Sequence, residues 1–241
     1  MQRNDSHIYV IIPTYNEREN ITSLVEKIFD LGLPNLEMMI VDDNSPDGTG
    51  RIAEALARQY PIQVIHREKK EGLGTAYTTA FKEILARNPE QKPEYIVQMD
   101  ADFSHDPAMI PALLNASEAH DVVIGSRYTP GGKIENWEYT RRVLSKWGNW
   151  YARAILRVPY RDMTSGFKCY RTEVLHTIDL NSLSSVGYNF QIETVYKAHT
   201  KGFRIREIPI TFTERRAGVS KMNIPIILES FWKVLALRLK E

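Results

Sequence analysis

Apolar, β-branched segments alternate with helix-forming segments through the first half of the chain, and this order restricts the possible folds most strongly. Strands are predicted over residues 7–13, 37–43, 62–66, 95–100 and 121–126. Between them, apolar residues recur at helical spacing over residues 16–29, 47–60, 72–87 and 105–116. Such alternation predicts an α/β domain with a mostly parallel sheet and helices on both faces.

The pattern changes after residue 130. A long helix is predicted over residues 138–157, then a strand over 167–171, a helix near 188–199, an extended segment over 203–212, a basic loop and a final amphipathic helix. We therefore expect one domain, residues 1–241, in which residues 1–130 form a nucleotide-binding core. Residues 131–241 would add a lid, an acceptor region and a membrane-docking region.

Charge is distributed unevenly along the sequence. Residues 1–106 hold 18 acidic and 11 basic side chains, a net charge of −7, whereas residues 107–241 hold 12 acidic and 20 basic ones, a net charge of +8. This asymmetry predicts that the second half meets an anionic partner. We expect that partner to be a phosphate compound or a membrane surface, and not a nucleic acid.

Several features of the sequence indicate a protein of a reducing compartment that does not span a membrane. The single cysteine, Cys169, cannot form an internal disulfide, and the first residues lack the pattern of a signal peptide. A spanning helix needs roughly 20 apolar residues. The most apolar candidate, residues 224–239, is interrupted by Glu229, Lys233 and Arg238. We expect a peripheral protein on the cytoplasmic face of a membrane.

Polar clusters follow three predicted strands, at the edge where open parallel sheets bind ligands. They are residues 13–17, 42–45 and 100–102. Asp100 and Asp102 stand one residue apart after a buried strand, so both carboxylates can face a divalent cation that prefers oxygen ligands. Mg²⁺ or Mn²⁺ held there would neutralise charge on the diphosphate of a leaving nucleotide.

Other chemistries fit the sequence less well. Aspartate-nucleophile phosphatases also use an Asp-x-Asp pair, but on the first strand, whereas this pair ends the fourth. The Gly72-Leu73-Gly74 segment lacks the third glycine of a dinucleotide-binding fingerprint. The six histidines show no spacing typical of a zinc site, and we interpret His105 as a polar strand-end residue.

Cationic side chains of the second half are the candidates for binding phosphate. They are Arg127, Arg141, Arg142, Arg215, Arg216 and Lys221. Arginine binds phosphate oxygens as a fork, and lysine adds a point charge. Gly218 would let the basic loop fold over a diphosphate. The alternative, an ordinary basic surface loop, is disfavoured by the acidic cluster expected opposite it.

Two helices of the second half carry apolar faces. On the long helix this face is Val143, Trp147, Trp150, Tyr151, Ala154 and Val158, bordered by Arg142, Lys146, Arg153 and Arg157. An aromatic face beside a basic stripe is typical of a helix at a lipid surface, and packing against the core is an equal alternative. The final helix presents Ile227, Leu228, Phe231, Trp232, Leu235 and Leu239. It would pack inward, touch lipid or dock to a membrane-spanning partner.

The motifs together resemble, in order, those of the dolichyl-phosphate mannose synthases, members of the inverting GT-A glycosyltransferases of family 2. The segments that carry the resemblance are PTYNERENI, VDDNSPDGT, REKKEGLGTAY, MDADFSHDP, GSRY, TSGFKCYR, GYNFQIE and RRAGVSK. They extend over essentially the whole chain. The resemblance implies the GT-A fold, a Rossmann-like sheet flanked by helices, with C-terminal amphipathic helices.

The resemblance also implies roles for individual residues. The nucleoside, expected to be guanosine, would be held by Pro13, Tyr15, Glu17, Val41 and Asp43. The metal and diphosphate would be held by Asp100, Ala101 and Asp102. Ser104 stands where some relatives have a glutamine metal ligand. Arg127 and Arg141 would receive the lipid phosphate, with Arg127 also close to the donor, and Arg215 and Lys221 would clamp the donor.

The expected reaction is transfer of mannose from GDP-mannose to dolichyl or polyprenyl phosphate, with inversion to a β-mannosyl phosphate. A lipid phosphate has a second pKa of about 6, so it is already an anionic nucleophile and needs no strong base. A sister transferase that uses UDP-glucose, and a non-catalytic binding subunit of the same fold, are the alternatives. Membrane attachment would depend on surface helices or on a small membrane-spanning subunit.

Overall fold

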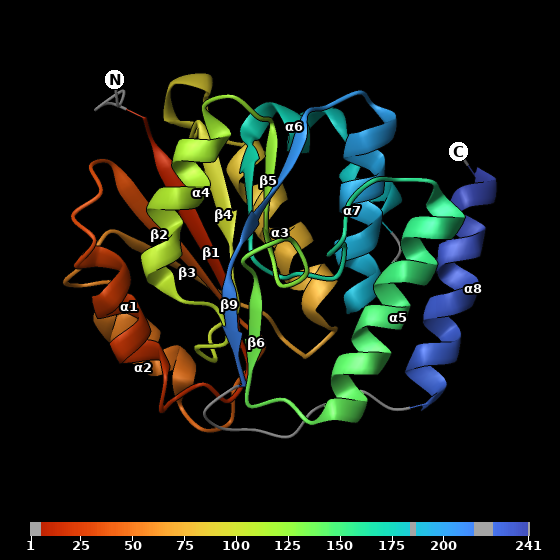
Figure 1. Ribbon diagram of the computed structural model, residues 1–241. Helices are drawn as coiled ribbons and strands as arrows, with labels where there is room; N and C mark the ends of the chain where they lie inside the picture. Colours follow the sequence, from red (N-terminus) through yellow and green to blue (C-terminus); the bar gives the residue numbers. More distant parts are fainter. Residues whose placement is uncertain (1–5, 184–186, 215–223, 241) are drawn as a thin grey trace.

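The computed structural model describes residues 6–183, 187–214 and 224–240. Its centre is a seven-stranded sheet with the order β3-β2-β1-β4-β7-β5-β8 (Figure 1). The strands are β1 (Ile8–Thr14), β2 (Leu36–Asp42), β3 (Ile62–His66), β4 (Tyr95–Gln98), β5 (Val122–Ser126), β7 (Lys168–Arg171) and β8 (Ile205–Pro209). A second sheet pairs β6 (Lys133–Glu135) with β9 (Thr211–Thr213).

Alternation of side chains along the strands builds one core on each face of the central sheet. In β1, Tyr9 and Ile11 belong to one apolar cluster, whereas Val10 and Ile12 belong to the other. All four side chains are buried, because a strand covered on both faces presents apolar groups to each. The prediction of a mostly parallel sheet with helices on both faces is confirmed.

The helices divide between the two faces. One face is covered by α1 (Ile21–Phe29), α2 (Thr49–Leu56) and α4 (Ile110–Ser117). The other is covered by α3 (Leu73–Leu85), α5 (Tyr139–Leu156), α6 (Thr172–Thr177), α7 (Tyr188–Thr200) and α8 (Ile224–Lys240). Short 3₁₀ turns occupy Pro89–Gln91, Pro107–Met109 and Leu180–Ser182. Helices α1 and α2 begin after loop residues with positive φ, Asn16 at 60° and Gly48 at 92°.

Strand β7 lies antiparallel between β4 and β5. The sequence predicts this short strand but not its central position. Its register sets Gln98 of β4 opposite Lys168. Because β7 runs against β4, the turn that precedes β7 reaches the carboxyl end of β4, which is the edge that bears Asp100.

The predicted extended segment over residues 203–212 divides into two strands that belong to different sheets. β8 pairs with β5 as far as Pro209 and Ser126. The amide of Ile210 then donates to the carbonyl of Ser126 at 3.1 Å, and the carbonyl of Ile210 accepts from Lys133 at 2.9 Å. The prediction of an extended segment is confirmed, but the sequence did not predict that the chain passes from one sheet to the other at Ile210.

Helices α5 and α8 pack side by side at one end of the molecule, next to α7 (Figure 1). The Tyr151 hydroxyl donates to the carbonyl of Phe231 at 3.2 Å, and the two rings lie 4.2 Å apart. Within the described residues, the structure contains no helix with the length and apolar character required to cross a membrane.

Candidate active site

The three predicted polar strand ends meet at one edge of the sheet. Thr14 at the end of β1 pairs in register with Asp42 at the end of β2, and its hydroxyl donates to that carboxylate at 3.0 Å. The amide of Asp43 donates to the carbonyl of Thr14 at 3.0 Å. Next to β4, the amide of Met99 donates to Ile11 at 3.2 Å. The sheet therefore brings residues 13–17, 42–45 and 100–102 to the same side.

A polar wall lies over the first two strand ends. The guanidinium of Arg67 donates to Asp43 at 2.7 Å and to the Thr75 hydroxyl at 2.8 Å. Burial raises the pKa of the Asp43 carboxyl, and the charges of Arg67 and Lys70 oppose that rise. The ammonium of Lys70 lies 3.5 Å from the centre of the Tyr15 ring. An aromatic ring, a carboxylate and two cations therefore border this half of the edge.

The other residues predicted to bind the donor differ in how far their side chains are exposed. Pro13 is partly exposed, and so is Glu17, whose carboxylate accepts from the Asn20 amide at 2.8 Å. The Val41 side chain is 0% exposed and belongs to the core, so Val41 reaches the edge through its backbone. Ala101 is also buried.

The Asp100–Asp102 pair lies where the chain leaves β4. The Asp102 side chain is buried, and its Oδ1 accepts from the Ser104 amide at 3.1 Å. A Cβ atom on Gly166 would stand 3.2 Å from Asp100 Oδ2, a tight contact that would require the carboxylate to shift by a small amount. The Ser104 hydroxyl is buried and has no hydrogen-bond partner in the described part of the chain.

These oxygens fit a hard divalent cation that also takes ligands from a substrate. The described residues contain no group of three or more His, Cys, Asp or Glu side chains able to hold a metal by themselves. Mg²⁺ is typically bound by one or two carboxylates together with substrate phosphates and waters. The two carboxylates, with the unpartnered Ser104 hydroxyl beside them, supply such a set.

His105 supports the Asp100–Asp102 turn from inside the protein. The backbone amide of Asp100 donates to His105 Nδ1 at 3.2 Å, and the ring stacks on Phe167 at 5.1 Å. Burial lowers the pKa of His105 to about 4, although Asp102 acts in the opposite direction. The imidazole is therefore neutral near pH 7 and accepts a hydrogen bond from a backbone N–H group, which fits its interpretation as a polar strand-end residue.

Arg127 forms a buried ion pair. Its Nε and Nη2 donate to Asp162 at 2.8 and 2.6 Å, and its backbone amide donates to the same carboxylate at 2.9 Å. Burial would raise the pKa of Asp162, but the charge and hydrogen bonds of Arg127 outweigh it and hold that pKa below its usual value. Asp162 is itself positioned by its amide, which donates to Glu207 at 2.8 Å.

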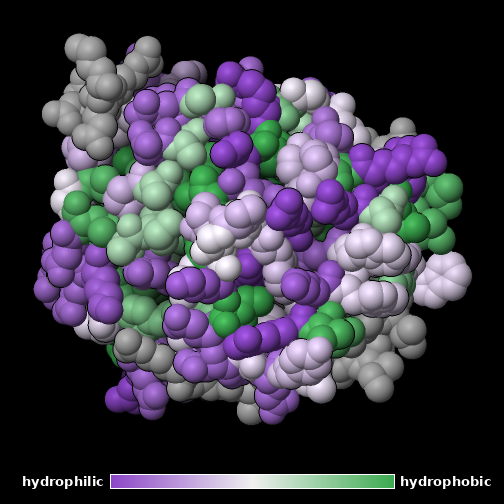
Figure 2. All heavy atoms as spheres, viewed as in Figure 1, coloured by the Kyte–Doolittle hydropathy of each residue, from purple (hydrophilic) through white to green (hydrophobic). Residues whose placement is uncertain are grey.

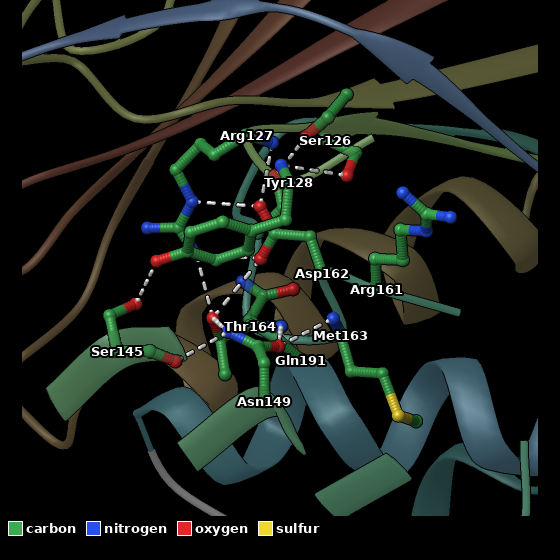
Figure 3. Close-up of polar contacts among 12 residues, drawn as sticks. Ser126, Arg127, Tyr128, Ser145, Asn149, Arg161, Asp162, Met163, Thr164 and Gln191 are labelled. Carbon is green, nitrogen blue, oxygen red and sulfur yellow. Dashed lines mark hydrogen bonds and ion pairs between the residues drawn. The ribbon is translucent and has the colours of Figure 1, made fainter. Parts of the chain in front are cut away.

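Helix α5 holds this ion pair from below, as Figure 3 shows. Asn149 Oδ1 accepts from the amides of Met163 and Thr164 at 2.9 and 3.3 Å. Asn149 Nδ2 donates to the Thr164 hydroxyl at 3.0 Å, and that hydroxyl accepts from Arg127 Nη2 at 2.7 Å. The Tyr128 hydroxyl donates to Ser145 at 2.7 Å. The inner face of α5 thus fixes the Arg127 guanidinium.

The structure describes some of the remaining predicted cationic residues and not others. Arg141 donates to Glu214 at 2.8 Å, and its guanidinium lies 4.1 Å from the Trp137 ring centre. Arg215 and Lys221 lie outside the described residues, so the predicted clamp on the donor stays a prediction.

Several residues at this edge were not predicted from the sequence. Arg67 and Asp162 are buried or nearly so and bind the predicted residues Asp43 and Arg127. Lys168 and Gln191 are buried and bind each other. Each stands in a segment whose apolar pattern indicates only a strand end, a loop or a helix. A signal in the sequence pointed to Asp162 alone. It is an acidic residue two positions before Thr164-Ser165-Gly166, in a turn that precedes a strand.

The outer face of α5 exposes large apolar side chains. Tyr139, Val143, Trp147 and Trp150 are 80%, 48%, 47% and 61% exposed. Figure 2 shows pale and green residues among strongly hydrophilic ones along this end of the molecule. Of the predicted face, Tyr151 instead packs on Phe231 and Val158 is buried. One stripe of α5 therefore packs inward, as the core-packing interpretation predicts, and one stripe is exposed; contact of that stripe with lipid stays a prediction.

Helix α8 is exposed at Trp232 and Leu239, by 72% and 79%. The predicted Ile227 and Leu228 belong to the part of α8 whose side chains lie outside the described set.

Comparison with known proteins gives consistent matches. A sequence profile described as Glycosyl transferase family 2 matches residues 9–179. Polyprenol monophosphomannose synthase of Mycolicibacterium smegmatis is 47% identical over 228 residues, which cover 93% of this chain and 84% of that protein. Undecaprenyl-phosphate mannosyltransferase of Micrococcus luteus is 42% identical, with coverages of 92% and 90%. Dolichol-phosphate mannosyltransferase of Pyrococcus furiosus is 39% identical, with coverages of 92% and 61%.

Solved structures confirm the fold. Glucosyl-3-phosphoglycerate synthase from Mycobacterium tuberculosis, crystallised with Mn²⁺, UDP and glucosyl-3-phosphoglycerate, superposes with a TM-score of 0.69. The alignment covers 98% of this chain and 79% of that one, at 18% sequence identity. At this identity, the similarity concerns the arrangement of the elements alone.

Proposed function

The chain belongs to glycosyltransferase family 2, and from that premise we propose that it transfers mannose from GDP-mannose to the phosphate of a polyprenyl phosphate. The observation that carries this proposal is the identity of 47% over nearly the whole chain with a polyprenol monophosphomannose synthase. The convergence of Tyr15, Asp43, Asp100 and Asp102 at one sheet edge supports it. Residues 1–130 would bind the donor, and residues 131–241 would receive the acceptor.

The donor would lie across the carboxyl ends of β1, β2 and β4. The wall of Tyr15, Asp43 and Arg67 supports binding of the nucleoside, because it offers a ring face together with charged hydrogen-bonding groups. Asp100 and Asp102 would hold Mg²⁺ or Mn²⁺, which supplies positive charge against the diphosphate when bound. Gly166 would leave room for that assembly, since a Cβ atom there would stand 3.2 Å from the Asp100 carboxylate.

The acceptor phosphate would enter from the side of α5. At neutral pH it is an anion that attacks the anomeric carbon without a general base, and a single displacement would give a β-linked product. Arg141 would attract the phosphate and help orient it for in-line attack. Asp162 holds the guanidinium of Arg127 in one orientation. We therefore assign Arg127 the role of stabilising negative charge at the reaction centre. Arg215 and Lys221 would cover the diphosphate.

The direct test is incubation of the purified protein with radiolabelled GDP-mannose, polyprenyl phosphate vesicles and Mg²⁺, followed by organic extraction. We expect label in a lipid product that mild acid releases as mannose. UDP-glucose serves as the parallel donor. Transfer from UDP-glucose alone would replace the proposed donor, and transfer from neither would favour a binding subunit.

We further propose that α5 attaches the protein to the cytoplasmic face of a membrane, where the lipid acceptor resides. Residues 139–157 contain five basic side chains and no acidic one. Arg142, Lys146 and Arg153 are exposed beside the aromatic stripe. Exposed aromatic groups flanked by cations match a surface of anionic lipid head groups. A small membrane-spanning subunit at α8 would add to this attachment.

Replacing Trp150 by Glu should weaken binding to anionic vesicles by about tenfold or more, because burial of a large apolar side chain is worth about 1.5–3 kcal/mol. Co-sedimentation with vesicles that contain phosphatidylglycerol measures the effect. Trp150 is a cleaner site than Trp147, which also packs on Phe231 with ring centres 4.9 Å apart. Trp147→Glu should therefore lower both vesicle binding and thermal stability.

Gln59→Glu is the matched control for the added charge. Gln59 is exposed just after α2, so its substitution should leave vesicle binding unchanged. Equal binding by Trp150→Glu and the parent protein would show that the stripe does not meet lipid.

A further inference from the structure

A lysine lies fully buried behind the carboxylates of the candidate site, and the proposed reaction gives it no role. Lys168 begins β7, and its side chain is 0% exposed. It pairs with Gln98 of β4. Continuing this antiparallel register by two residues sets Gly166 opposite Asp100, in agreement with their close approach. Lys168 and Asp100 are therefore diagonal neighbours on one face of the sheet, a separation of about 7–8 Å that long side chains can bridge.

Two glutamines enclose the lysine. Its ammonium donates to Gln191 Oε1 at 2.6 Å and to the Gln191 carbonyl at 3.2 Å. Gln98 Nε2 donates to the same Gln191 Oε1 at 2.7 Å and to the Gly166 carbonyl at 3.1 Å. Gln191 belongs to α7 and appears below the Arg127 cluster in Figure 3. This buried unit joins the strand that delivers Asp100 to β7 and α7.

Taken by itself, the buried group of Lys168, Gln98 and Gln191 is unfavourable for the stability of the fold. The structure records no carboxylate of the described chain within ion-pair distance of the Lys168 ammonium, and an unpaired buried charge is costly. Gln98 Oε1 and Gln191 Nε2 are buried without a hydrogen-bond partner among the described residues. An apolar side chain of similar length would avoid these costs. A role at the adjacent site accounts for the presence of a cation here.

The charge of Lys168 depends on the charges around it. Burial lowers its pKa to about 7, whereas Asp162 and Asp100 raise it and Arg127 lowers it. The ammonium is thus coupled electrostatically to the edge where the metal and the diphosphate would bind.

We propose that Lys168 is a positioning residue whose charge weakens binding of a divalent cation at Asp100 and strengthens binding of a nucleoside diphosphate. This inference rests on the proposed function. A positive charge close to Asp100 repels a cation, and it attracts an anionic diphosphate. The same charge therefore acts with opposite sign on the two ligands. Because a fixed charge adds the same energy whether or not the second ligand is bound, the effect of one ligand on the other is unchanged.

Lys168→Met tests the proposal, because methionine keeps the length of the side chain and removes the charge. Mn²⁺ binding is followed by the electron paramagnetic resonance signal of free Mn²⁺, with and without GDP. In the variant, Mn²⁺ should bind about tenfold more tightly whether or not GDP is present, and GDP alone, followed by isothermal titration calorimetry, should bind about tenfold more weakly. At an effective dielectric constant of about 20, unit charges about 7 Å apart interact strongly enough for such a factor.

Three further variants complete the test. Lys168→Arg keeps the charge and should retain the parent affinities for Mn²⁺ and for GDP. Tyr170→Phe alters another buried side chain of β7, whose hydroxyl donates to Thr194 at 3.3 Å, and should leave Mn²⁺ binding unchanged. If thermal unfolding shows that the methionine variant does not fold, Lys168→Gln gives the same comparison, since its amide can still donate to Gln191.

The outcomes separate this inference from the proposed function. If the parent protein binds Mn²⁺ with GDP and transfers mannose, but neither uncharged variant changes the affinity for Mn²⁺ or for GDP, the role of Lys168 is wrong and the function stands. If the parent protein binds Mn²⁺ with neither GDP nor UDP, the proposed donor site is wrong, and the inference is overturned with it.

Discussion

Asp102→Asn should abolish detectable mannosyl transfer, a loss of about 10³-fold or more, while the fold remains intact. Removing one group that stabilises transition-state charge costs up to about 10³-fold, and Asp102 would also hold the metal. Asparagine has the same shape, and its amide oxygen can still accept from the Ser104 amide, as Asp102 Oδ1 does at 3.1 Å. Initial rates of labelled lipid formation at saturating Mg²⁺, with circular dichroism of the variant, measure both expectations.

Asp106→Asn is the matched control. Asp106 is exposed four residues away and accepts from the Ala108 amide at 3.0 Å at the start of a 3₁₀ turn. Asparagine is an equally good cap, so this variant should transfer at the parent rate. Unchanged turnover in Asp102→Asn would refute the metal assignment.

Asp162→Asn should lower the free energy of unfolding by about 3–5 kcal/mol, because removal of one partner leaves a buried charge uncompensated. Arg127 and Asp162 side chains are 6% and 0% exposed. The amide nitrogen of asparagine would face the guanidinium, donor against donor. Urea unfolding at pH 7 followed by tryptophan fluorescence measures the loss as a lower midpoint. A midpoint equal to that of the parent would show that the ion pair does not stabilise the fold.

Arg204→Ala provides the contrast. Arg204 binds Asp121 at 2.8 Å with its own side chain 63% exposed, so solvent screens the pair and the midpoint should hardly move. The acid dependence should also differ. The folded-state pKa of Asp162 is lowered, so its stabilisation is fully present above the unfolded pKa of about 3.9. The parent should lose that stabilisation as the pH falls through the folded pKa, whereas Asp162→Asn should lack this part of the acid dependence.

The fold was predictable to the extent that strands and helices leave periodic patterns in sequence. Residues 7–13 and 37–43 are continuous apolar runs, and they form β1 and β2 with boundaries close to those predicted. The place of β7 in the sheet was not predictable, because the four residues from Lys168 to Arg171 do not indicate which strands they pair with. Its antiparallel position between β4 and β5 is decided by long-range packing.

The residues of the candidate site also divide into those that could be predicted from the sequence and those that could not. Asp43, Asp100 and Asp102 follow strands directly, so the parallel sheet brings them together whatever the loops do. Asp162, Lys168 and Gln191 reach the edge through β7, the turn before it and α7. Their side chains are buried polar groups whose hydrogen-bond partners are distant in sequence. Local sequence patterns do not identify such distant partners, so these residues could not be predicted.

The position of β7 has a consequence for biosynthesis. On a ribosome, β1 to β4 emerge first and can assemble as the block β3-β2-β1-β4, with helices α1 to α3 available to cover it. The outer edge of β4, and both edges of β5, gain partners only after residues 168–171 and β8 have been made. Unpaired strand edges are sites of aggregation. A nascent chain stalled before residue 168 would therefore expose such edges and depend on chaperones more than the completed chain does.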